Sequence, residues 1–85
     1  MHEYHLVKSL VKSVFEKTSS LKNFKKVTLI KLQLGDLKMA GRESFTETFK
    51  EVSRGTICEG ATLEIKEVKG DVLLVESIEG EFEKG

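Results

Sequence analysis

The sequence of 85 residues has one cysteine, no proline and no tryptophan, and it has no long apolar run. With Cys58 alone the chain cannot form an internal disulfide, and without a CxxC pair it lacks the ligands of a structural zinc site. No apolar stretch reaches the roughly 18 residues of a membrane span, and the N-terminus lacks the apolar core and cleavage site of a secretory signal. We therefore expect a cytoplasmic protein in a reducing compartment, with no membrane contact.

Net charge is also absent, because fourteen basic and fourteen acidic side chains cancel and neither sign forms a long run. The basic footprint of a nucleic-acid-binding protein is missing, so we expect no nucleic-acid partner. We interpret the local excess at Lys22, Lys25 and Lys26 as a solvated loop and strand start. A single domain of this length buries a modest fraction of its surface, and dimerisation would stabilise it.

Hydrophobic spacing predicts two helices and three strands in the order α-β-α-β-β. Apolar residues recur at three- and four-residue intervals in the helical segments, whereas the strand segments alternate or are rich in β-branched residues. Helices are expected at 4–18 and 42–54, and strands at 26–34, 61–68 and 72–78.

This order predicts an α+β fold with both helices on one face of a mixed three-stranded sheet. The second helix is long enough for a right-handed crossover between the first two strands, and Lys69-Gly70-Asp71 favours a hairpin between the last two. Val27 and Leu29 are expected to point away from Ile30, which leaves apolar side chains on the second sheet face. That face is either an interface or an ordinary, partly apolar surface.

The chain opens Met1-His2-Glu3, which brings together an α-amine, a backbone amide and an imidazole. The bulky His2 should protect Met1 from removal, because the processing enzyme accepts only small second residues. Nitrogen donors in tetragonal geometry favour Ni(II) or Cu(II) over zinc. Alternatively, His2 and His5 are polar residues of a frayed terminus. The segment His2-Glu3-Tyr4-His5 is one residue too short for a zinc-protease motif.

Four blocks of the sequence resemble the HypA/HybF family of nickel metallochaperones, which deliver nickel for [NiFe]-hydrogenase maturation and, in some organisms, for urease. The blocks are MHEYHLVKSL, KKVTLIKLQLGDL, ESFTETFKEVSRGTICEGATLEI and LLVESIEGE. The resemblance implies that His2 anchors Ni(II), assisted by the Met1 amine and the His2 amide. The Glu3 amide is an additional candidate ligand, with the Glu3 side chain nearby. The resemblance also implies transfer of nickel to a GTPase partner and then to the hydrogenase large subunit.

Two features depart from the family pattern. The first is His5, where a small residue such as serine is more usual. If the helix begins early enough, His2 and His5 face the same side and His5 could supply a fourth nitrogen ligand, with simple solvent exposure as the alternative. The second is the absence of the family's zinc segment with two CxxC pairs, because residues 67–71 join the second and third strands directly.

We therefore expect residues 1–85 to form a single nickel-binding domain that contains no zinc. An engineered excision is favoured over a natural zinc-less relative. Loss of the zinc module puts in doubt its contribution to dimer formation and to partner docking, while a homodimer of the remaining domain stays an open expectation. The nickel-site residues are intact.

A small structural or dimerising protein-interaction module is the main alternative function. It would use the second sheet face and an exposed strand edge, and its histidines would be incidental. An enzyme is the weakest interpretation, because Cys58, His2 and His5 are the only obvious nucleophiles or bases and no oxyanion-hole or phosphate-binding motif accompanies them. Cys58 is better explained as a small, partly buried side chain. We expect no enzymatic activity.

Overall fold

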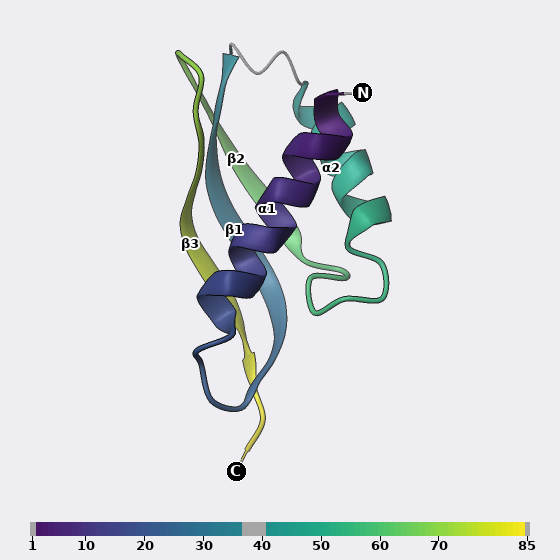
Figure 1. The fold of residues 1–85 in the computed structure, drawn as a ribbon, viewed down its shortest axis with the longest axis vertical. Helices are drawn as coiled ribbons and strands as arrows, with labels where there is room; N and C mark the ends of the chain where they lie inside the picture. Colours follow the sequence, from purple (N-terminus) through teal and green to yellow (C-terminus); the bar gives the residue numbers. More distant parts are fainter. Residues whose placement is uncertain (1, 37–40, 85) are drawn as a thin grey trace.

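The computed structural model describes the backbone of residues 2–36 and 41–84, and the side chains of residues 4–36 and 41–84. The elements follow the predicted order, and the α+β class is confirmed (Figure 1). They are α1 (His2–Thr18), β1 (Phe24–Gly35), α2 (Arg42–Val52), β2 (Thr62–Val68) and β3 (Leu73–Phe82).

Strand β1 is the centre of the sheet, with β2 parallel along one edge and β3 antiparallel along the other. The predicted mixed three-stranded sheet is therefore confirmed, but the predicted hairpin between the last two strands is wrong, because β2 and β3 are not neighbours. At 12 residues β1 is the longest and most buried strand. A central position pairs both edges of β1, so more of its buried backbone N–H and C=O groups form hydrogen bonds than at the edge of the sheet.

The link between β2 and β3 crosses over the end of β1. The Gly35 amide donates to the Val72 carbonyl at 2.7 Å, and the Gly70 amide donates to Asp36 Oδ1 at 2.9 Å. Gly70 has a φ of 108°, in the region that favours glycine. Residues 69–71 therefore belong to a connection that joins the two outer strands, which lie about 10 Å apart on either side of β1.

Both helices cover one face of the sheet, and α1 contacts both α2 and β3 (Figure 1). The side chains that fill the space between helices and sheet are almost fully buried. They are Val7, Leu10, Val11 and Val14 of α1, Phe45 and Phe49 of α2, and Val27, Ile30, Leu32 and Leu34 of β1, together with Cys58.

Val27 belongs to this core, which corrects the expectation that it points to the second sheet face. Its side chain is 1% exposed, like those of the core residues further along β1. The β1–β3 pairing shifts register between Val27 and Leu29, and such an irregularity changes which face successive side chains occupy. Leu29 stays half-buried, and Leu74 of β3 is 52% exposed.

Gly35 is a position where the fold tolerates no side chain. A Cβ atom added there would lie 2.1 Å from the Gly70 carbonyl oxygen and 2.6 Å from the Val72 nitrogen. Both are backbone atoms of the crossing link, so Gly35→Ala should lower the free energy of unfolding by about 2–3 kcal/mol. Gly41→Ala is the control, because a Cβ there meets nothing within 4 Å. Urea denaturation followed by circular dichroism would contradict the account if both variants lost the same stability.

Candidate metal site at the start of helix α1

Helix α1 begins at His2, so His2 and Glu3 lie in its first turn. The first four backbone N–H groups of a helix have no acceptor within the helix. The amide nitrogens of His2 and Glu3 are therefore not engaged in the helical ladder. Met1 lies outside the described residues, as do the side chains of His2 and Glu3, so only the backbone of His2 and Glu3 and the whole of His5 are described.

Helix α1 begins early enough to include both His2 and His5, which are three residues apart. This is the arrangement in which His5 could supply a fourth ligand. Residues at this spacing lie on the same side of a helix, with Cβ atoms about 5–6 Å apart. The His5 side chain is exposed, and its ring centroid lies 6.1 Å from that of Tyr4 in an edge-on arrangement. The backbone thus places His5 on the same side of the helix as the predicted nickel anchor.

Lys8 adds a positive charge to the same side of α1. Its Nζ lies 5.2 Å from the centroid of the Tyr4 ring, within the range of a cation–π interaction. Lys8 follows His5 by three residues, so its charge opposes a cation held by His5 alone. Among the side chains that the structure describes, no three His, Cys, Asp or Glu residues gather into a metal site. Any site that includes His5 therefore depends on the terminal residues.

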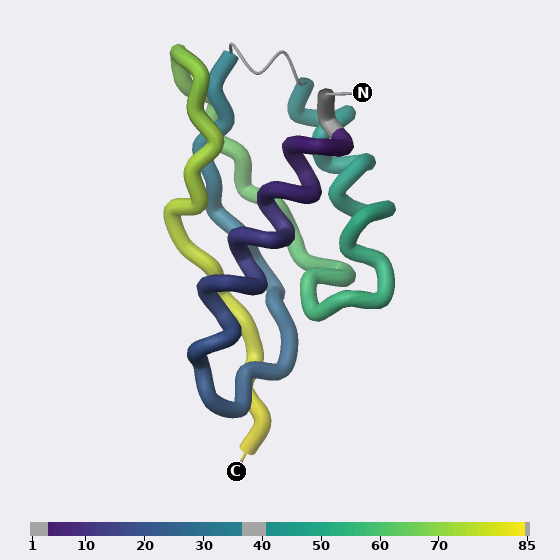
Figure 2. The backbone as a smooth tube through the Cα atoms, in the orientation of Figure 1, coloured from purple at the N-terminus to yellow at the C-terminus, as the bar shows by residue number. Residues whose placement is uncertain are grey.

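The first coloured turns of α1 lie toward one end of the molecule, near the start of α2, and the end of β3 lies at the other (Figure 2). No buried side chain precedes Val7 among the described residues of α1, since Tyr4 and His5 are exposed and Leu6 is half-buried. Tyr4 and His5 are thus accessible on a helix whose later turns are anchored in the core.

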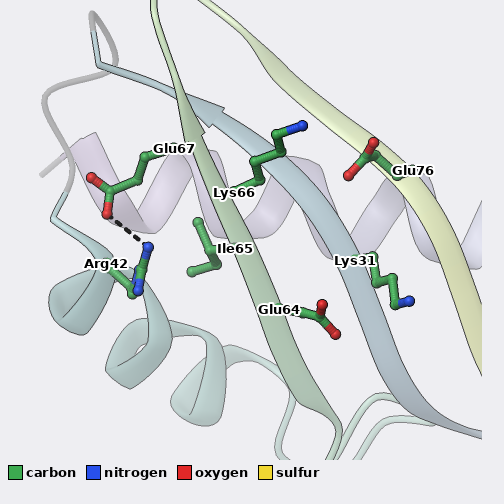
Figure 3. A pocket seen from close by; sticks show the side chains of 7 residues that line it. All are labelled: Lys31, Arg42, Glu64, Ile65, Lys66, Glu67 and Glu76. Carbon is green, nitrogen blue, oxygen red and sulfur yellow. Dashed lines mark ion pairs between the residues drawn. The ribbon is translucent and has the colours of Figure 1, made fainter.

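A hollow of about 630 Å³ lies over the outer face of the sheet and the edge of β2 (Figure 3). Lys31 lies beside Glu64 in the strand register, and Arg42 of α2 pairs with Glu67 of β2 at 3.0 Å. Both members of that ion pair are more than half exposed, so it contributes little to stability. Charges of opposite sign alternate across this face, and no convergent set of ligands results.

Cys58 is completely buried, in agreement with its interpretation as a small packed side chain rather than a nucleophile. Burial raises the pKa of the Cys58 thiol, and a hydrogen bond with the Thr56 side chain lowers it to a lesser extent. The reactive thiolate is therefore disfavoured in the folded protein.

Comparison with known proteins decides the family. The sequence model described as "Hydrogenase/urease nickel incorporation, metallochaperone, hypA" matches residues 1–74. The chain belongs to the HypA family. The resemblance inferred from its four sequence blocks is confirmed, and the match includes the Met1-His2-Glu3 terminus.

Individual HypA relatives support this assignment. The hydrogenase maturation factor HypA of Methylocella silvestris is 42% identical over 71 residues, which cover 84% of this chain and 62% of the relative. HypA of Desulfitobacterium hafniense is 38% identical over 66 residues, covering 78% of this chain and 57% of the relative. The chain thus spans about three fifths of the length of these curated relatives.

The fold is also that of a solved HypA structure. The solution structure of the Ni metallochaperone HypA from Helicobacter pylori superposes with a TM-score of 0.67 at 20% identity, covering 91% of this chain and 72% of that one. In the part of this HypA-family chain that the structure describes, no helix is both long and apolar enough to cross a membrane.

The burial of Cys58 predicts slow chemistry at its sulfur. The folded protein should react with a thiol reagent such as DTNB far more slowly than the urea-unfolded chain, because the thiol is inaccessible and its ionised form is disfavoured. Stopped-flow absorbance across a urea series should show the rate rising with the unfolded fraction. Fast, urea-independent labelling would show that Cys58 is an accessible thiol.

Proposed function

We propose that this chain is the nickel-binding part of a HypA metallochaperone, which holds Ni(II) as cargo at Met1-His2-Glu3 and passes it to a partner protein. The observation that carries the proposal is the family match, which begins at Met1 and runs to residue 74. The acceptors proposed from the family are a nickel-handling GTPase and the large subunit of a [NiFe]-hydrogenase, with urease as a second destination. No catalytic step is needed for this role.

The start of a helix suits the proposed ligands for an electrostatic reason. The Met1 amine, the His2 amide and the His2 imidazole would supply three nitrogen donors, and the amide must lose its proton to bind. The positive end of the helix dipole stabilises an anionic amide nitrogen and opposes a bare cation. Because the first-turn amides have no helical acceptor, losing a proton there breaks no helical hydrogen bond.

The fourth position is proposed for either the Glu3 amide or the His5 imidazole. The helical start at His2 supports His5, since the two residues share one side of α1. Lys8 acts against it, because its positive charge lies on that same side. We therefore assign His2 the anchoring role and His5 a supporting one.

Residues 1–85 are proposed to form one nickel domain without the family's zinc segment. A single core joins both helices and the central strand, as expected of one domain. Residues 69–72, between β2 and β3, lie outside all three strands. A segment inserted there would leave both ladders of β1 in place, so its absence is compatible with an intact nickel domain.

Nickel titration of four proteins tests the terminal site. Protein with its native Met1 should bind one Ni(II) tightly and show the absorption band of square-planar nickel, whereas His2→Ala and a version with one residue added before Met1 should bind at least about a hundredfold more weakly. His5→Ala should lose less than about tenfold. If all four proteins bind alike, the terminus is not the site, and the protein-interaction module becomes the better interpretation.

Nickel affinity should rise with pH. An amine with a reference pKa near 7.7–8.0 and an imidazole near 6.5 must both be neutral to bind, and the amide releases a further proton. The apparent affinity should therefore increase by at least about a hundredfold between pH 6 and pH 8. Isothermal titration calorimetry in buffers of different ionisation enthalpy would count the released protons. An affinity independent of pH would exclude the amine and amide as ligands.

A further inference from the structure

We propose that a groove between α1 and α2 binds an acidic, amphipathic helix of a partner protein. The groove, called here the α1–α2 groove, is a hollow of about 280 Å³ lined by Lys8, Val11, Lys12, Phe15, Val52 and Thr56. It lies on the helical side of the molecule, away from the outer sheet face. This proposal does not depend on nickel binding.

Apolar side chains form the floor of the α1–α2 groove and extend beyond it. Phe15 is 38% exposed although it lies on a helix whose neighbouring apolar residues are buried. An adjoining hollow of about 620 Å³ shares Phe15 and Thr56 with the groove and adds Leu21, which is 45% exposed. Two large apolar side chains are therefore left partly uncovered in two adjoining hollows, as expected of a surface that a partner covers.

The charged side chains that line the α1–α2 groove have one sign. Lys8 and Lys12 line it, and no carboxylate lines either hollow. Within the described part of the chain, neither lysine forms an ion pair. On α2 and the segment after it, Glu51 pairs with Arg54 at 3.0 Å and Glu59 accepts from the Gly55 amide at 3.2 Å. A partner that places carboxylates against Lys8 and Lys12 would be electrostatically complementary.

The shape favours a helix as the occupant. Lys8, Lys12 and Phe15 are spaced four and three residues apart on α1, so they lie along one side of a helix of 17 residues. An opposing amphipathic helix can lay its apolar side chains over Phe15 and Leu21 and direct its acidic residues to the lysines. A second copy of this chain fits less well, because a symmetric pairing of the groove with itself would bring lysines against lysines.

The α1–α2 groove also has a defined relation to the start of α1. Phe15 lies about 20 Å along the helix axis from His2, at 1.5 Å per residue. A partner helix of about 18 residues lying along the groove would be long enough to reach the proposed nickel terminus. If the proposed function holds, docking here would bring an acceptor beside the nickel terminus.

Two synthetic peptides test the inference without nickel. Both are amphipathic helices of about 18 residues with the same leucine face. One has glutamates on its polar face and the other has lysines. In ¹H–¹⁵N spectra the acidic peptide should shift the amides of Phe15, Val52 and Thr56, and the basic peptide should shift them little. Added salt should weaken the acidic peptide's binding, because the attraction is partly ionic.

Variants locate the binding surface. Replacing both groove lysines, Lys8→Glu with Lys12→Glu, should weaken the acidic peptide about tenfold, and Phe15→Ala should weaken it by a similar factor. The control is Lys66→Glu with Lys69→Glu, which makes the same charge change at exposed residues of β2 and the following link and should alter binding less than about twofold. Circular dichroism confirms that each variant is folded.

Several results would overturn the proposal. These are equal binding of both peptides, no binding of either, chemical shifts that map to the outer sheet face, or equal effects of the two double variants. Concentration-dependent dimerisation that is lost on Phe15→Ala would assign the groove to a second copy. Binding to vesicles of phosphatidylcholine and phosphatidylserine, lost in the Lys8→Glu and Lys12→Glu protein, would assign it to a membrane surface. If the native protein binds the acidic peptide but does not bind nickel, the proposed function is refuted and the inference about the groove stands.

Discussion

Strand β1 is hydrogen-bonded along both edges and covered on one face by both helices, and the position of every other element follows from it. Its core-facing side chains, among them Ile30, Leu32 and Leu34, supply the sheet's main contribution to the hydrophobic core. Gly35 ends the strand without a side chain, which lets the link from β2 to β3 pass close over it. A central strand of this kind holds a small sheet together although its two outer strands never meet.

This arrangement divides helix α1 into an anchored part and a free end. Val7, Leu10 and Val14 are fully buried against the sheet and α2, and burial of such side chains contributes about 1.5–3 kcal/mol each. Among the described side chains of the first turn, Tyr4 and His5 are exposed and provide no comparable anchor. A metal ion could reorganise that turn at little cost to the core. A carrier benefits from this, because ligands that move can be exchanged one at a time with an acceptor.

The helices and strands could be predicted from the sequence because their periodicity is local and strong. The order of the strands could not be predicted, because Lys69-Gly70-Asp71 is locally a suitable hairpin turn. The chain instead crosses to the far edge of the sheet, where β3 pairs with the second edge of β1. Val27 was misplaced because a register shift between strands leaves no mark in the sequence. The terminal metal site came from donor chemistry and family resemblance. The α1–α2 groove was missed because it requires knowing that Val52 and Thr56 lie beside α1, although the spacing of Lys8, Lys12 and Phe15 was visible.

Nickel K-edge X-ray absorption on the one-to-one complex tests most directly whether nickel is held by nitrogen ligands at the start of α1. We expect a square-planar pre-edge feature, a first shell of four nitrogen or oxygen atoms, and outer-shell scattering from imidazole that is weaker in His2→Ala. A six-coordinate shell, a sulfur neighbour, or imidazole scattering unchanged by His2→Ala would contradict this expectation.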